Sequence, residues 1–156
     1  MKKILKLIIS IAICQVAGLI GSIFTMPQIE NWYSDLSKPW FNPPNWIFGP
    51  VWTLLFLLMG IALFLVWSEA GDNRKKIKAV SVFSIQLLLN ILWSVLFFGL
   101  NSPLSSFVEI IFLWVFILIT LVYFYRVSKT AGLLLLPYLF WVSFASALNF
   151  FIWKLN

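Results

Sequence analysis

The sequence predicts an all-α integral membrane protein, a single domain over residues 1–156 built as a bundle of five transmembrane helices. Composition leads to this prediction first: 62% of the residues are hydrophobic and only 10% are charged, against about 25% in an average soluble domain. The mean hydropathy of +1.00 agrees with it. The apolar residues also fall into five runs, each close to the roughly 20 residues that a helix needs to cross a bilayer.

The five apolar runs follow one another with short polar or proline-containing connections. The first run is preceded by lysines, but it is too long for a signal peptide and no A-x-A-like site follows it, so we expect a retained span. Pro27 is expected to end this helix, whereas Pro50 falls in the first turn of the next, where proline is tolerated. The expected helices cover residues 5–26, 46–67, 79–100, 104–125 and 133–153, with a loop rich in Trp and Pro over residues 27–45.

The basic residues alternate between the two ends of these spans. Lys plus Arg number three at the N-terminus, one, four, none and two in the successive loops, and one in the C-terminal tail. By the positive-inside rule we expect the N-terminus to be cytoplasmic and the Trp/Pro loop and the C-terminus to lie on the opposite side. The membrane we expect is the cell (plasma) membrane. The net charge of +6 therefore reflects membrane orientation, and no nucleic-acid partner is expected.

The sequence offers little to metal or acid–base chemistry. It contains no histidine, which removes the commonest general base and the commonest haem and metal ligand. Its one cysteine, Cys14, lies inside the first apolar run, where it can form neither an intrachain disulfide nor a zinc site. We predict no metal site, no cofactor and no catalytic residue.

One stretch stands out in the first loop. Residues 32–52, WYSDLSKPWFNPPNWIFGPVW, hold four of the nine tryptophans and four of the seven prolines. Such a segment is a stiff, aromatic loop, and two interpretations remain open: an interfacial belt that anchors the loop, or a lid over a cavity for a flat apolar ligand. Lys38 is accordingly either a solvated loop residue or a partner for an anionic ligand tail.

Three of the expected helices carry a face that mixes aromatic residues with an amide or a small residue. Such faces either hold helices together by hydrogen bonds or line an apolar cavity with few polar groups. The residues on these faces, by spacings of three and four, are Gln86, Asn90, Trp93 and Phe97; Pro137, Trp141, Ala145 and Asn149; and Trp52, Phe56 and Gly60.

Two further features lie inside the spans. Gln15, Gly18, Gly21 and Ser22 give the first helix a small, slightly polar side that favours close helix approach. Glu109 is the only acid within a span, and its place near the start of the fourth helix predicts that it reaches headgroups or water.

Three segments resemble the signatures of the tryptophan-rich sensory protein/translocator protein family (TspO/MBR), once called the peripheral-type benzodiazepine receptor. They are residues 32–52, QLLLNILWSVLFFG at 86–99 and LPYLFWVSFASALNFFIW at 136–153. The resemblance implies a five-helix bundle, often a homodimer, that binds porphyrins such as protoporphyrin IX, and also sterols and synthetic isoquinoline or benzodiazepine ligands. The implied pocket lies between helices under the first loop, and its ligand-binding residues are Tyr33, Trp40, Trp52, Asn90, Trp93, Trp141, Phe144 and Ala145.

The resemblance leaves three functions to weigh. The leading one is a membrane protein that binds tetrapyrroles and related apolar ligands for transport, sensing or disposal. The alternatives are a light- and oxygen-dependent porphyrin-degrading enzyme, as reported for some bacterial members, and a lipid- or sterol-binding membrane scaffold. The family's sterol-recognition pattern matches residues 145–154, but Phe150 stands where that pattern has tyrosine.

Overall fold

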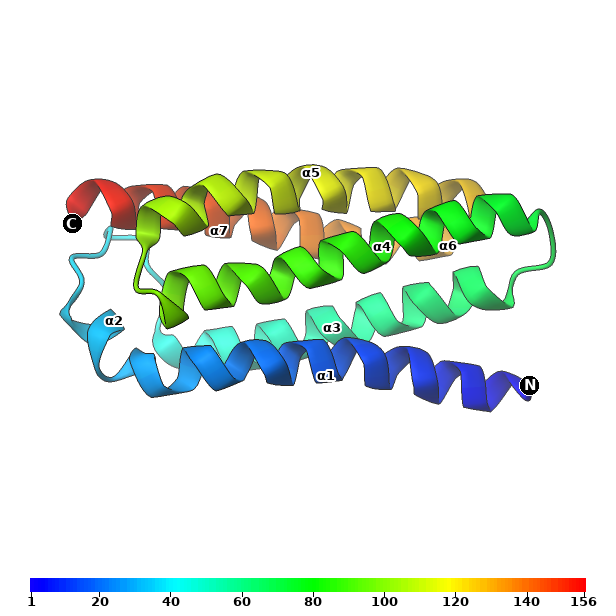
Figure 1. Ribbon diagram of the computed structural model, residues 1–156, viewed down its shortest axis with the longest axis horizontal. Coiled ribbons are helices and arrows are strands. Elements are labelled where there is room, and N and C mark those ends of the chain that lie inside the picture. The colour runs from blue at the N-terminus through cyan, green and yellow to red at the C-terminus, as the bar shows by residue number, and fades with distance from the viewer.

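The computed structural model describes residues 1–156 and shows a bundle of five long helices with short elements at its ends (Figure 1). All five long segments are long and apolar enough to cross a membrane, which confirms the predicted fold class. The elements in order are α1 (Lys3–Ile29), α2 (Trp32–Asp35), α3 (Asn45–Ser68), α4 (Asn73–Ser94), the π-helical turn η1 (Val95–Gly99), α5 (Pro103–Val127), α6 (Lys129–Leu133) and α7 (Leu136–Leu155).

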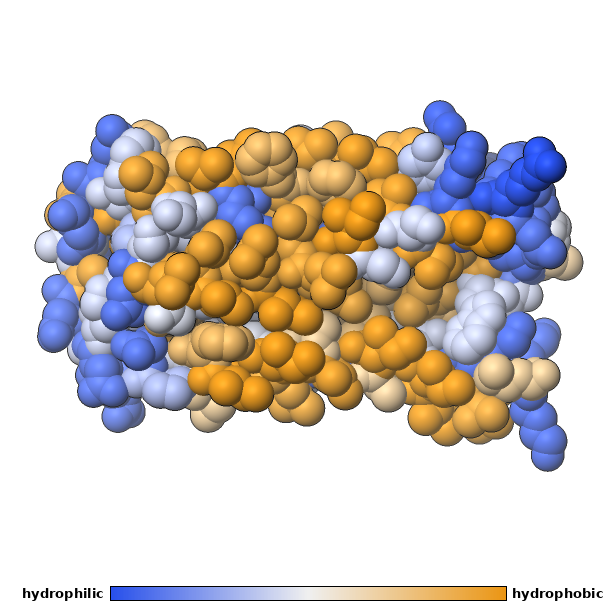
Figure 2. All heavy atoms as spheres, in the orientation of Figure 1, coloured by the Kyte–Doolittle hydropathy of each residue, from blue (hydrophilic) through white to orange (hydrophobic).

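The molecule has an apolar middle and two polar ends. Figure 2 shows a continuous hydrophobic belt along the bundle, with hydrophilic residues gathered at both ends. One end carries the N-terminus and the turn between α3 and α4, and we call it the basic end (Figure 1). The other carries α2, the loop over residues 36–44 and the C-terminus, and we call it the loop end. This distribution is that of an integral membrane protein.

The helices α1, α3 and α5 are longer than expected, α4 begins and ends earlier, and α7 begins three residues later. Pro27 lies inside α1, because a proline in the last turn removes only one intrahelical bond. The freed end is supported by Asn31, whose Nδ2 donates to the Pro27 carbonyl oxygen. At the basic end, α4 begins at Asn73 and includes the charged residues expected in a loop, since the Asp72 side chain accepts from the backbone N–H of Arg74 and caps the helix.

One close approach within the bundle joins α1 to α3. A Cβ atom added at Gly60 would lie 2.6 Å from the Cα atom of Ile11, so only glycine allows this crossing. On the other side of the bundle, the Phe83 and Phe124 rings stack with their centroids 5.4 Å apart and join α4 to α5. Both contacts lie in the half of the bundle nearer the basic end, which is filled with side chains.

Glu109 is not where the sequence placed it. Its side chain is buried inside the bundle, 6% exposed, and neither carboxyl oxygen has a hydrogen-bond partner. The expectation that it reaches headgroups or water is therefore wrong. The reason is helical register: Ser106, Ile110 and Leu113 are also buried, and together with Glu109 they form the inward face of α5.

The loop over residues 36–44 is fastened across the loop end at several points. The Asn156 side chain pairs with the backbone of Ser37, accepting from its N–H at 3.0 Å and donating to its carbonyl oxygen at 2.9 Å. The Tyr33 hydroxyl donates to Asn42 Oδ1 at 2.9 Å, and Lys38 Nζ lies 4.7 Å from the centre of the Tyr33 ring. Burial raises the pKa of Tyr33 to about 12, although the hydrogen bond with Asn42 acts in the opposite direction.

Candidate ligand cavity

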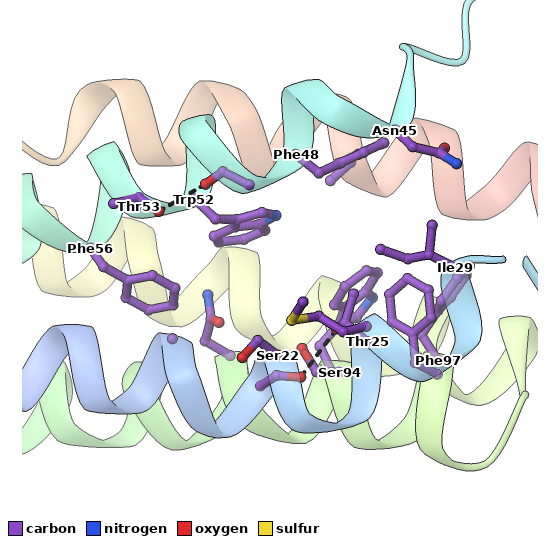
Figure 3. A pocket seen from close by; sticks show the side chains of 18 of the residues that line it. Ser22, Thr25, Ile29, Asn45, Phe48, Trp52, Thr53, Phe56, Ser94 and Phe97 are labelled. Carbon is purple, nitrogen blue, oxygen red and sulfur yellow. Dashed lines mark hydrogen bonds between the residues drawn. The ribbon is translucent and has the colours of Figure 1, made fainter.

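A cavity of about 420 Å³ lies in the half of the bundle nearer the loop end. Its walls come from α1, α3, α4, η1 and α7, with Tyr33 of α2 at one end. In Figure 3 the side chains of α3, from Asn45 to Phe56, face those of α1 across this space, with Ser94 and Phe97 beyond them. The volume falls within the roughly 300–1,000 Å³ of small-molecule sites.

Four tryptophans line the cavity. Three of them come from three helices and are held against other rings: Trp52 of α3, Trp93 of α4 and Trp141 of α7. The fourth, Trp46 of α3, is 73% exposed. Trp93 stacks on Phe97 with ring centroids 5.1 Å apart and planes 17° from parallel. Trp141 lies edge-on to Phe48 at 6.0 Å. Because each of the first three indoles is held against another ring, their aromatic faces are fixed before any ligand arrives.

An asparagine fixes the position of Trp93. The Trp93 indole N–H donates to Asn149 Oδ1 at 3.0 Å, and Asn149 Nδ2 donates to the Pro103 carbonyl oxygen at 2.8 Å. One amide thus links α4, α7 and the first residue of α5, and all of its bonds lie at the cavity wall. In hydrocarbon these partners matter because no water is available to replace them.

A second polar network lies behind Asn90. Asn90 Nδ2 donates to the Tyr138 hydroxyl at 2.7 Å, and that hydroxyl donates to Gln86 Oε1 at 2.9 Å. Gln86 Nε2 approaches Met59 Sδ at 3.7 Å. All four side chains are buried, but only Asn90 lines the cavity, so it is the one member of the network that a ligand can meet.

The wide turn η1 shapes the end of the wall. Its backbone follows the i to i+5 pattern, since the Leu100 N–H donates to the Val95 carbonyl oxygen at 2.8 Å. The consecutive residues Phe97 and Phe98 are both buried and both line the cavity. An edge-to-face contact at 5.4 Å between Phe97 and Trp32 connects this wall to α2.

Six of the eight residues predicted for the ligand site lie together around this cavity, and two do not. Trp40 lies on the surface of the loop, 95% exposed, against Phe41. Phe144 lies outside the lining and packs between Trp141 and Phe41. That these residues bind a ligand stays a prediction. The six that line the cavity are Tyr33, Trp52, Asn90, Trp93, Trp141 and Ala145.

The largest group that sequence reasoning missed is on α1. The small and polar residues that were expected to serve helix packing line the cavity instead, although Gly18 and Gly21 also contact Phe56 and Ser94 closely. Their spacing was the available signal. Met26 also lines the cavity, although the sequence predicted no haem ligand there. Its thioether is a group that can ligate haem iron. The lining residues from α1 are Gln15, Ala17, Gly18, Leu19, Gly21, Ser22, Thr25, Met26 and Ile29.

The lining contains no acidic or basic side chain, so the cavity walls offer a ligand aromatic faces, aliphatic surface and a few hydroxyl and amide groups. Aromatic faces of this kind are suited to stacking against a flat apolar molecule. Lys38 is the cation nearest to Tyr33, and its Nζ already donates to the carbonyl oxygens of Ser34 and Leu36.

Comparison with known proteins agrees with this architecture. The profile of the TspO/MBR family matches residues 10–154. The chain is 52% identical to the tryptophan-rich protein TspO of Archaeoglobus fulgidus, over 98% of each chain. It is also 50% identical to the protein of the same name from Chlorobaculum tepidum, over 99% of this chain and 98% of that one. Its identity to the human translocator protein is 36%, over 88% of this chain and 82% of that one. The chain therefore belongs to the TspO/MBR family.

Proposed function

We propose that this membrane protein binds a tetrapyrrole such as metal-free protoporphyrin IX, or a related flat apolar ligand, in the cavity at the loop end. The observation that carries the proposal is the set of three fixed indoles, Trp52, Trp93 and Trp141, around a cavity of about 420 Å³. A conjugated macrocycle offers two large faces for stacking, and base or ring stacking on aromatic side chains is worth about 1–3 kcal/mol for each ring. The bound ligand serves transport, sensing or disposal.

The orientation of the ligand follows from the polarity of the walls. The carboxylate tails of protoporphyrin cannot be buried among apolar side chains, so they point out of the cavity at the loop end. Lys38 is the loop cation there, and an anionic tail competes with the backbone carbonyl oxygens that its Nζ now contacts. The family resemblance supports the same placement, under the first loop, and a homodimer as the working assembly.

The decisive experiment is a titration of the purified protein with protoporphyrin IX, read by quenching of tryptophan fluorescence. Trp141→Ala removes an indole that lines the cavity and should weaken binding by about tenfold or more, from the loss of one stacked ring. Trp40→Ala is the matched control, because it removes an indole that is 95% exposed and outside the cavity. Equal losses in the two variants, or no saturable quenching in wild type, would refute the proposal.

The same three indoles allow a test of the enzyme alternative, since a tryptophan beside a bound porphyrin is placed to react when the porphyrin is illuminated. Wild-type protein and the variants Trp52→Phe and Trp141→Phe are illuminated in air with excess protoporphyrin. Degradation that exceeds the amount of protein, and that disappears in the variants without loss of binding, would make the protein an enzyme. Degradation limited to one equivalent indicates a stoichiometric photoreaction without turnover, and no degradation indicates binding alone.

A further inference from the structure

The cavity does not have a closed wall on the side of α1 and α3. Several residues that line the cavity are also exposed on the outer surface of the bundle. On α3 these are Asn45, Gly49 and Thr53, which recur at spacings of four and form one helical edge. On α1 they include Leu19 and Met26, which are 65% and 70% exposed. Two edges that face each other therefore border an opening.

The two helices are joined at the end of this opening nearer the basic end. At Gly60 and Ile11 their backbones are in contact, as the 2.6 Å approach of a Cβ at Gly60 shows. Nearer the loop end, Gln15 Nε2 donates to the Thr53 carbonyl oxygen at 3.2 Å and bridges the two helices. Beyond Thr53 the side chains of α1 and α3 border the cavity from opposite sides without a hydrogen bond between them (Figure 3). The opening is a slit that runs from the Gln15 bridge towards the loop end.

The slit lies within membrane-spanning segments, so its outer side meets lipid rather than water. Gly49 and Thr53 are four and eight residues after the start of α3, which places them roughly 6–12 Å below the start of the helix at 1.5 Å per residue. The aqueous side is covered in comparison, because Asn156 and Asn42 hold the loop over residues 36–44 across the loop end. We propose that the slit between α1 and α3 is the route by which flat apolar molecules dissolved in the bilayer reach the cavity.

This inference rests on the proposed function and adds the source of the ligand, which enters from the hydrocarbon of the bilayer and not from water. It gives a role to the small and polar residues that α1 contributes to the wall beside its larger apolar ones. Gly18 has no side chain and Ser22 has a small one, so both leave room for a ring to pass, whereas large side chains at these positions would close the slit. Gln15 marks the inner limit of the route, because its bond to α3 joins the rims there.

Exchange kinetics of metal-free protoporphyrin IX in lipid nanodiscs test the route. Gly49→Phe adds a ring at the rim, where an added Cβ atom meets nothing within 4 Å. It should slow both association and dissociation by about tenfold, since a barrier on the route opposes entry and exit alike, and the two rates rather than the affinity are the readout. Leu54→Phe is the matched control: Leu54 is 54% exposed on the same helix but does not line the cavity, and its variant should exchange at the wild-type rate.

A variant of the loop end distinguishes the competing route. Asn156→Ala removes both bonds to Ser37 and loosens the loop over residues 36–44. Access through the slit predicts unchanged exchange rates in this variant. Faster exchange in Asn156→Ala, together with wild-type rates in Gly49→Phe, would overturn the proposal in favour of access through the loop end, and wild-type rates in both variants would overturn it as well.

A measurement without porphyrin keeps this test separate from the proposed function. In vesicles of phosphatidylcholine brominated on its acyl chains, bromine quenches only indoles that the chains can contact. The fluorescence of Trp52, obtained as the difference between wild type and Trp52→Phe, should be quenched by these lipids and protected in a Gly49→Phe background. Absence of quenching of Trp52 would overturn the lateral route even if porphyrin binds, whereas quenching without any porphyrin binding would overturn only the proposed function.

Discussion

The contact between α1 and α3 at Gly60 gives the most direct test of how the bundle is held together. Gly60→Ala and Gly49→Ala make the same chemical change in the same helix. At Gly60 the new Cβ atom meets the Ile11 backbone at 2.6 Å, whereas at Gly49 it meets nothing within 4 Å. The pair therefore separates the effect of the helix crossing from the general effect of replacing glycine in a helix.

The expected magnitude follows from these distances. Carbon atoms pack best at about 3.5–4.0 Å, so α1 must move by about 1 Å to accept the methyl group at Gly60. Over-packing of this kind costs about 1–3 kcal/mol. Both substitutions also gain helix propensity, about 1 kcal/mol in each case, and this term cancels in the comparison. Gly60→Ala should thus be less stable than Gly49→Ala by about 1–3 kcal/mol.

Unfolding of the two variants in the same detergent, followed by circular dichroism against temperature, measures this difference. We expect Gly49→Ala to melt at or above the wild-type temperature and Gly60→Ala below it. Displacement of α1 should also widen the slit above Gln15 and speed porphyrin exchange in Gly60→Ala. Equal melting temperatures for the two variants would show that the backbones of α1 and α3 are not in contact, and would refute the reasoning.

Four further predictions concern the site and the orientation. Asn90→Leu should weaken protoporphyrin binding by roughly twofold to tenfold, the value of one hydrogen bond, whereas unchanged affinity with a lower melting temperature would make Asn90 a packing residue that supports Tyr138. Metal-free protoporphyrin should bind at least as well as its iron form, and a spectrum of axial ligation that is lost in Met26→Leu would contradict this. The raised pKa of Tyr33 means that its contribution to stability is complete below about pH 10 and is lost as the pH rises towards 12; the difference in melting temperature between wild type and Tyr33→Phe, followed against pH, should shrink over this range. Reporter fusions should place the N-terminus in the cytoplasm and the C-terminus outside, and two termini on the same side would exclude five spans.

The number and order of the spans could be predicted because hydrocarbon leaves few alternatives to a helix. Every backbone N–H and C=O must be paired inside the bilayer, so a run of about 20 apolar residues has one available structure. The ends of helices were harder to place. The charged start of α4 forms a helix because the Asp72 side chain caps it. A single hydrogen bond of this kind cannot be detected from the hydropathy of the sequence.

The wall of the cavity could be predicted where an indole or an amide recurred at helical spacing, as at Trp52, Asn90 and Trp141. The contribution of α1 was missed because small residues predict close packing and cavity walls equally well. Which of the two occurs depends on how α1 packs against α3, whose backbones meet at Gly60. Trp40 shows the converse case, since its place in an aromatic motif says nothing about the direction of its side chain from a proline-rich loop.

The turn η1 determines which mutations residues 95–99 can accept. A π-helical turn contains one residue more than the α-helical turn it replaces, and such turns are frequent at functional sites. Deletion of a single codon within residues 95–99 would restore an ordinary α-helix and rotate everything before the turn relative to α5. Phe97 and Phe98 could then no longer both face inward. We expect this segment to accept changes of side chain far more readily than changes of length, so deletion scanning should find it intolerant where substitution scanning does not.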